Sequence, residues 1–206
     1  MVLFATSSNP KYVIYLGKDK YENEELIKYG FPIDVWFHVE HLSSAHVYLR
    51  LPDGVDIDSI PKDVLDECCQ LVKDGSKEGR KKETVSVCYT MWDNLKKTNA
   101  MEVGEVGFKD QSKVRVVTGI AKNNDLLKTL KKTIQEKTVD YAAEKESYNV
   151  EMANRRKKQL DEDKRKLQEE IKKQKELKKE MRFEYIDELG EATTNKDNVD
   201  LEDDFW

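Results

Sequence analysis

The sequence predicts an α+β protein: a small mixed or antiparallel sheet with packed helices, followed by a long charged helix and an acidic tail. Short apolar runs of strand type alternate with turn residues and two helical segments through the first 121 residues. No Gly or Pro occurs from residue 123 to residue 189, which favours helix. The final segment, 183–206, carries nine acidic residues against one basic residue. We therefore expect a domain over 1–121, a helical or coiled-coil extension over 122–189 and a disordered tail over 190–206.

Six apolar runs in the domain have the length and composition of β-strands. They cover Val2–Thr6, Tyr12–Leu16, Val35–Val39, Val47–Leu51, Val85–Thr90 and Val114–Thr118. Two further segments have helical periodicity, and a glycine that favours a helix end follows each of them. They are Glu22–Tyr29, before Gly30, and Pro61–Lys73, before Gly75. The second helix has apolar residues spaced for a buried stripe, so we expect it to pack on the sheet.

The extension begins with an apolar stripe, which we expect to pack on the domain. The stripe consists of Leu126, Leu127, Leu130 and Ile134. Beyond Asp140 a heptad pattern continues in Leu160, Leu167, Ile171, Met181 and Tyr185. Polar residues fill the remaining seam positions, which are Lys164, Gln174 and Lys178. Such a seam buries little apolar area, so the extension is expected to be a monomer or a weak dimer.

The charge changes sign along the chain, although the whole chain carries a net charge of -5. Residues 1–121 carry 16 Lys and Arg against 19 Asp and Glu, whereas residues 122–182 carry 19 against 13. A basic helical extension thus follows a mildly acidic domain. Basic helix faces engage phosphate in a salt-dependent way, although most such runs only keep a helix solvated.

The cysteines and the hydropathy of the sequence indicate the compartment in which the protein is expected. Cys68, Cys69 and Cys88 form no CxxC pair, so buried, reduced thiols are expected rather than a zinc site. The longest stretch without a charge, residues 1–10, is too short for a membrane span and lacks the basic start of a signal peptide. These features predict a soluble protein of the cytoplasm, or also of the nucleus, without a membrane span.

The strand pair Val35–Val39 and Val47–Leu51 is the most informative segment, because side chains of a strand alternate between two faces. One face is apolar throughout and is expected to meet the core. The other, here called the polar face, carries Trp36, His38, Glu40, His46, Tyr48 and Arg50. Rings stack on bases and cations contact phosphate, so the polar face is a candidate nucleic-acid-binding surface. The alternative is that a helix covers Trp36 and His38 and that both are hydrogen-bonded there.

Basic residues elsewhere supply further candidate contacts for phosphate. Lys96 and Lys97 lie between Trp92 and a glycine-containing turn, where the alternative is a solvated loop. The extension contributes a secondary basic patch formed by Arg155, Arg156, Lys157 and Lys158.

No catalytic residue, cofactor site or metal site is predicted. The three histidines, His38, His41 and His46, lack the HExxH spacing of a zinc hydrolase. A glycine-rich phosphate loop, a GxSxG elbow and a Cys–His arrangement are also missing from the sequence. We therefore expect a protein that is not an enzyme and needs no cofactor.

Four segments, in order along the chain, resemble motifs of the NFACT-R domain, the RNA-binding module of large ribosome-quality-control factors. The segments are Gly17–Lys18 with Glu22–Leu26, Asp34–Val39, Ser44–Val47, and Tyr89 to Val106. The similarity covers residues 1–120, and a free-standing domain with a charged coiled coil and an acidic end resembles the coiled-coil domain-containing protein 25 family. Where larger members have Gly-Ser-His-Val, this chain has Ser44-Ala45-His46-Val47. It also lacks the N-terminal and helical-hairpin domains that recruit tRNA, so peptide tailing is not expected.

The resemblance implies contact with RNA or the ribosome, extended to DNA, at positions that match the motifs. These positions are Trp36, His38, His46, Lys96 and Lys97. Arg50 is added because it lies on the polar face. We therefore predict a nucleic-acid-binding adaptor associated with RNA or the ribosome, as in ribosome quality control. The alternative is a structural protein whose extension binds another helical protein.

Overall fold

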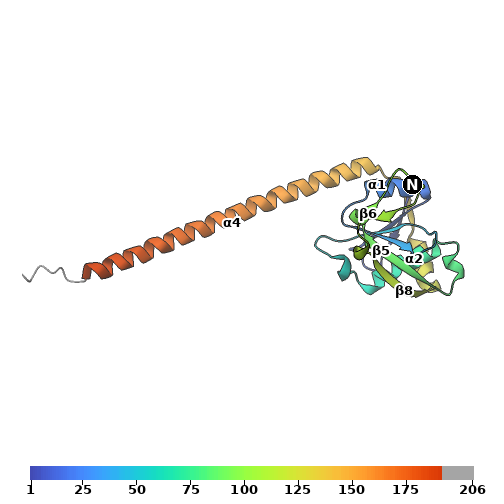
Figure 1. Ribbon diagram of the computed structural model, residues 1–206, viewed down its shortest axis with the longest axis horizontal. Helices are drawn as coiled ribbons and strands as arrows, with labels where there is room; N and C mark the ends of the chain where they lie inside the picture. Colours follow the sequence, from blue (N-terminus) through green and yellow to red (C-terminus); the bar gives the residue numbers. More distant parts are fainter. Residues whose placement is uncertain (192–206) are drawn as a thin grey trace, which may run out of the picture. The chain divides into compact units, whose positions relative to one another are not determined.

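The computed structural model describes residues 1–191, so the expected acidic tail lies almost entirely outside the described residues. The chain divides into a compact unit, Met1–Tyr148, and a second unit that begins at Asn149 (Figure 1). Within residues 1–191, no helix is both long enough and apolar enough to cross a membrane.

The first unit is built on a seven-stranded sheet in the order β8-β5-β3-β4-β2-β1-β9, with every neighbouring pair antiparallel. The strands are β1 (Val2–Thr6), β2 (Val13–Gly17), β3 (Asp34–Val39), β4 (Val47–Arg50), β5 (Thr84–Met91), β8 (Arg115–Ala121) and β9 (Gln135–Lys137). Six of them correspond to the predicted strands. A separate hairpin pairs β6 (Leu95–Lys96) with β7 (Gly107–Phe108). The predicted α+β class is confirmed.

Helices and short 3-10 turns connect the strands. α1 (Lys20–Tyr29) begins where the Asp19 side chain accepts hydrogen bonds from two backbone N–H groups, and it ends at Gly30. α2 (Lys62–Asp74) ends at Gly75, as the sequence predicts. The 3-10 turns are η1 (Ile57–Ser59), η2 (Gly79–Lys81), η3 (Trp92–Asn94) and η4 (Gln111–Lys113).

Both faces of the sheet are buried. The apolar face of β3 and β4 forms one core with side chains of α2 and of α3 (Asn124–Thr133), among them Val64, Cys68 and Leu130. The polar face forms a second core that includes Trp36 and Tyr48. Its cover comes from three elements, which contribute Leu26 of α1, Leu95 and Phe108 of the β6–β7 hairpin, and Tyr141. The alternation of residues between two faces is therefore confirmed, and the sheet is the middle of three layers.

The prediction of a helical extension over 122–189 is wrong between Ile134 and Asp140, which are not helical. The chain ends α3 at Thr133 and adds β9, which pairs antiparallel with β1. β1 would otherwise expose the N–H and C=O groups of a sheet edge, so strand pairing outweighs the helix preference of these few residues. The expected packing of the leucine stripe is confirmed, since Leu127 and Leu130 are buried.

α4 (Tyr141–Glu191) has 51 residues and is about 75 Å long at 1.5 Å per residue. Its first two turns, through Tyr148, belong to the first unit. From Asn149 to Phe183 almost every described side chain is exposed, including the heptad residues Leu160, Leu167 and Ile171. Ion pairs one turn apart support this part of the helix, such as Glu151 with Arg155 at 2.8 Å.

Replacing Leu130 with Ala is expected to lower the free energy of unfolding of the first unit by about 2 to 5 kcal/mol, because the change leaves a cavity between α3 and the sheet. Urea denaturation of the full chain measures this. Leu160→Ala is the matched control: its side chain is 54% exposed, so it should leave the transition unchanged. A loss below about 1 kcal/mol for Leu130→Ala would show that α3 is not part of the cooperative unit.

Candidate nucleic-acid interface

The structure brings three of the predicted site residues together on the polar face. β3 carries Trp36 and His38, and His46 directly precedes β4. The Trp36 and His38 rings are stacked, with centroids 5.3 Å apart and an interplanar angle of 5°. His46 meets both rings edge-on, at 5.3 Å from Trp36 and 5.1 Å from His38. The three rings form one compact aromatic cluster.

This aromatic cluster is covered rather than open to a base. Trp36 is 2% exposed and His46 is 4% exposed. His38 occupies one face of the indole, and Phe108 of β7 lies edge-on to it at 5.7 Å. Burial, with smaller contributions from the nearby His38 and Lys97, lowers the pKa of His46 to about 3, and burial also lowers the pKa of His38. Both imidazoles are therefore neutral near pH 7 and offer no cation to phosphate.

The structure agrees only in part with the alternative that a helix covers Trp36 and His38 and that both side chains are hydrogen-bonded. The β6–β7 hairpin, in addition to a helix, lies over Trp36. Within the described residues, four buried side-chain atoms have no hydrogen-bond partner: Asn23 Oδ1, Trp36 Nε1, His46 Nδ1 and Tyr48 Oη. An unpaired buried polar group costs about 1 to 3 kcal/mol. These four atoms are therefore hydrogen-bonding groups that the fold itself does not use.

Lys96 and Lys97 have different environments. The Lys97 ammonium donates to Glu24 Oε1 at 2.7 Å and to the carbonyl oxygens of Glu102 and Glu105 at 2.6 and 2.8 Å. The backbone N–H of Gly104, where φ is +87°, donates to the same Glu24 oxygen. Burial alone would raise the pKa of Glu24, but these hydrogen bonds lower it overall. Lys97 thus fastens the 97–105 loop to α1, whereas Lys96 is exposed.

Sequence reasoning did not find the Glu24 partner, because it lies 73 residues from Lys97 and helix α1 had no feature that connected it to this loop. The available signal was the acidic character of the Glu22–Leu26 motif, which contains Glu22, Glu24 and Glu25.

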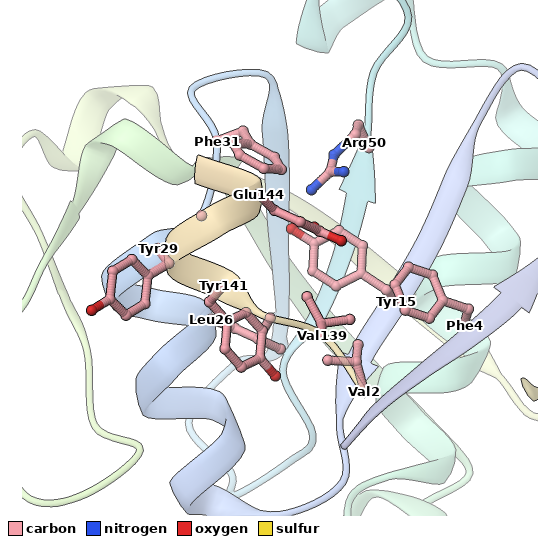
Figure 2. Close-up of a pocket in the computed structure, with 11 residues that line it drawn as sticks. Val2, Phe4, Tyr15, Leu26, Tyr29, Phe31, Arg50, Val139, Tyr141 and Glu144 are labelled. Carbon is pink, nitrogen blue, oxygen red and sulfur yellow. The ribbon is translucent and has the colours of Figure 1, made fainter. Parts of the chain in front are cut away.

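Arg50 lies at the end of β4 and is held by the buried carboxylate of Asp34. Its Nε donates to Asp34 Oδ1 at 2.9 Å, and its side chain is 30% exposed. Figure 2 shows the guanidinium beside the rings of Phe31 and Tyr15, 4.0 and 5.3 Å from their centroids. Arg50 is separated from His46 by four residues, or about 13 Å along the strand.

A small cavity beside Arg50 is too narrow for a base. It is lined by aromatic and apolar side chains that include Phe4, Tyr15, Phe31 and Tyr141 (Figure 2). Its volume of about 20 Å³ admits about one water molecule. Nucleic acid would therefore meet Arg50 from outside, by its exposed edge.

The secondary basic patch lies in the second unit, on α4. Arg155 pairs with Glu151, and Arg156, Lys157 and Lys158 are exposed.

The described residues contain no cluster of three His, Cys, Asp or Glu side chains that could hold a metal ion. Cys68, Cys69 and Cys88 are buried free thiols. Burial raises the pKa of Cys69 to about 12 and that of Cys88 to about 11, so neither thiol is activated as a nucleophile.

Comparisons with known proteins agree with the motifs. Residues 1–110 match the family described as NFACT protein RNA binding domain. The chain is 47% identical to coiled-coil domain-containing protein 25 of Bos taurus, over 98% of this chain and 99% of that one. It is 54% identical to the Mus musculus protein of the same name, over 81% of each chain. It is also 41% identical to protein JLP2 of Saccharomyces cerevisiae, over 62% of this chain and 63% of that one.

A solved structure has a similar fold. It is the C-terminal part of the fibronectin/fibrinogen-binding protein from Streptococcus suis, with a TM-score of 0.52 and 22% identity. The similarity covers 62% of this chain and 48% of that one. At this identity it supports the fold alone.

The buried His46 is expected to make the protein less stable in acid. Its pKa is about 3 in the folded state and about 6.5 in the unfolded chain, so only the unfolded chain takes up a proton between these values. The contribution of the neutral His46 to the free energy of unfolding is therefore complete above about pH 6.5 and is lost as the pH falls towards 3. Between pH 7 and pH 5 the loss is about 2 kcal/mol, measurable by urea denaturation at each pH.

His46→Gln should flatten this pH dependence. His41→Asn should not, because the His41 side chain is 89% exposed. A His46→Gln protein with the pH dependence of the parent would contradict the role given to His46.

Proposed function

This chain belongs to the coiled-coil domain-containing protein 25 family, and we propose that it acts as a non-enzymatic adaptor that binds nucleic acid, with RNA as its ligand. The match of residues 1–110 to the NFACT protein RNA binding domain carries this proposal. The non-enzymatic part of the proposal is in keeping with the buried Cys69 and Cys88 thiols, whose raised pKa values keep them protonated and poor nucleophiles.

We assign different roles to the predicted site residues. Trp36 and His46 support the surface from beneath, and Lys97 fixes the loop that covers them. The exposed side chain of Lys96, which pairs with Gly107 in the β6–β7 hairpin, contacts phosphate directly. The partly exposed His38 and Arg50 lie along the same face and contribute hydrogen-bond donors at its edge.

The finer proposal is that the RNA is part of the ribosome, as for the ribosome-quality-control factors that the motifs resemble. Localisation in the cytoplasm, extended to the nucleus, would accompany this role. DNA shares the phosphate backbone but lacks the 2′-hydroxyl group, so competition between RNA and DNA of one sequence separates the two ligands. Sequencing of RNA crosslinked to the protein in cells would identify the RNA, and recovery of no RNA above background would contradict the proposal.

A second candidate function is binding of another helical protein by α4. Exposed apolar residues at heptad spacing favour it, namely Leu160, Leu167 and Ile171. Salt separates the two functions, because phosphate binding weakens steeply as salt rises and apolar helix packing does not.

Lys96→Ala is expected to weaken binding of single-stranded RNA without lowering the melting temperature. Loss of one phosphate contact should reduce the slope of log K against log salt by about 0.7. Lys97→Ala should instead destabilise the domain by about 1 to 2 kcal/mol, because Glu24 and two carbonyl groups lose their shared donor. Fluorescence anisotropy over a salt series, with thermal melts of each protein, measures both effects.

A stable Lys96→Ala protein with the affinity and salt slope of the parent would count against the proposed contact. Arg50→Ala is a less direct test, because it leaves the buried carboxylate of Asp34 without its charged partner.

The polar positions in the α4 seam predict a monomer or a weak dimer at micromolar concentration, which sedimentation velocity measures. A tight dimer that dissociates only when Leu160, Leu167 and Ile171 are changed to polar residues would contradict this and favour the helical-partner function. Leu177→Gln is the matched control outside those heptad positions, because Leu177 is 58% exposed and Leu167 is 57% exposed.

A further inference from the structure

A group of exposed lysines lies on the first unit beyond the residues that match the RNA-binding family. They are Lys122, Lys128, Lys131 and Lys132, and they line a shallow groove together with Asp74, Asn124 and Leu127. Lys128 and Lys132 are one helical turn apart on α3 and therefore project from the same side. Within residues 1–191, neither of their ammonium groups takes part in a hydrogen bond or an ion pair.

A rigid scaffold holds this lysine surface. α3 is fixed to the core by Leu127 and Leu130, which are 4% and 2% exposed. The Gln70 side chain of α2 donates to Ala121 O at 2.7 Å and accepts from the backbone N–H of Asn123 at 2.9 Å, just before α3 begins. The lysines are thus presented at fixed positions rather than on a mobile loop.

A buried lysine lies next to the groove. The ammonium of Lys73, whose residue is 1% exposed, donates to Glu83 O at 2.7 Å and Ile120 O at 2.9 Å. These bonds join the chain just before β5 to the end of β8, two residues before Lys122. Lys73 therefore fixes the position from which Lys122 projects and adds positive charge behind the groove.

The charge of this surface is opposite to that of the domain beside it. Residues 1–121 carry three more acidic than basic residues, whereas residues 122–137 carry five lysines against two acidic residues. Of the groove residues only Asp74 is acidic, and it pairs with Lys131 at 2.7 Å. Like charges one turn apart destabilise a helix by about 0.2 to 0.5 kcal/mol, and no ion pair within residues 1–191 neutralises Lys128 or Lys132.

The chemistry of the groove selects phosphate rather than bases. Lysine ammonium groups act as point charges that bind phosphate. The residues that line the groove include no aromatic ring on which a base could stack.

We infer that the lysine surface of Lys122, Lys128, Lys131 and Lys132 is a second contact for the phosphate backbone of nucleic acid, separate from Lys96, an inference that rests on the proposed function. A ligand that spans both contacts gains affinity, because the second contact forms at high effective concentration. The surface adds affinity without reading sequence.

The test compares the full chain with its Lys128→Ala, Lys132→Ala variant in binding a single-stranded uridine oligonucleotide over a salt series. Loss of two phosphate contacts should reduce the slope of log K against log salt by about 1.4 and weaken binding by about tenfold at low salt. Alanine is the strongest helix former, so α3 remains folded, and a thermal melt verifies this. Lys128→Arg with Lys132→Arg should retain the slope of the parent.

The matched control is Lys11→Ala with Lys62→Ala, which removes the same charge. Both side chains are exposed, and Lys62 begins α2, about 18 Å along that helix from Asp74. The control should retain the parent slope, and an equal loss in the control would overturn the inference in favour of a general charge effect.

If the α3 variant has the same slope of log K against log salt as the parent, the inference is overturned. The proposed function still stands in that case, because the parent binds RNA. A parent chain that binds no RNA at any salt concentration would overturn both. The inference would also be overturned by an α3 variant that keeps its RNA affinity but no longer binds an acidic peptide such as poly-glutamate. That result would identify the groove as a site for acidic protein segments.

Discussion

The buried carboxylate of Asp34 joins three parts of the first unit that are far apart in the sequence. It accepts hydrogen bonds from Tyr15 Oη of β2 at 2.5 Å, from the backbone N–H of Phe31 after α1 at 2.9 Å, and from Arg50 of β4. A carboxylate without exposure is tolerated only when such partners are present, since an uncompensated buried charge costs several kcal/mol. Asp34 therefore fixes the return of the chain from α1 to the sheet, and with it the position of α1 over the polar face.

Once α1 is fixed there, the polar face becomes a second core. Trp36 and Tyr48 pack beneath α1 and the β6–β7 hairpin, and Lys97 closes the hairpin loop onto Glu24. Side chains that would stack on bases in an open sheet are used for packing. Of the predicted contact residues on this face and its cover, Lys96 is exposed and His38 and Arg50 are partly exposed. The proposed nucleic-acid binding would then rest on contacts with phosphate, and its affinity would depend on salt more than on sequence.

We could predict six strands, two helices and the division of the β3–β4 side chains between two faces, because each of these features depends on local periodicity. The cover over Trp36 could not be predicted in this way. Leu95 and Phe108 are separated from Trp36 by many residues, and a two-residue strand has too few positions to show alternation. β9 was missed for a related reason: its pairing satisfies the edge of β1, and nothing in Gln135–Lys137 itself indicates that need. Three of the predicted site residues, Trp36, His38 and His46, form one cluster, and the cover over this cluster depends on these nonlocal contacts.

The family match and the folding unit have different ends, and this affects where function can reside. The match stops at residue 110, inside the chain between β7 and β8, whereas the compact unit continues to Tyr148. β8 covers the edge of β5, α3 closes the apolar core, and β9 covers the edge of β1. The sheet begins within the matched residues, and it needs these three elements to be complete. Their outward side chains are not constrained by that packing, and on α3 they include Lys128, Lys131 and Lys132. Elements added to complete a fold can in this way extend the charged surface of the domain, because their buried stripe and their exposed side chains are selected independently.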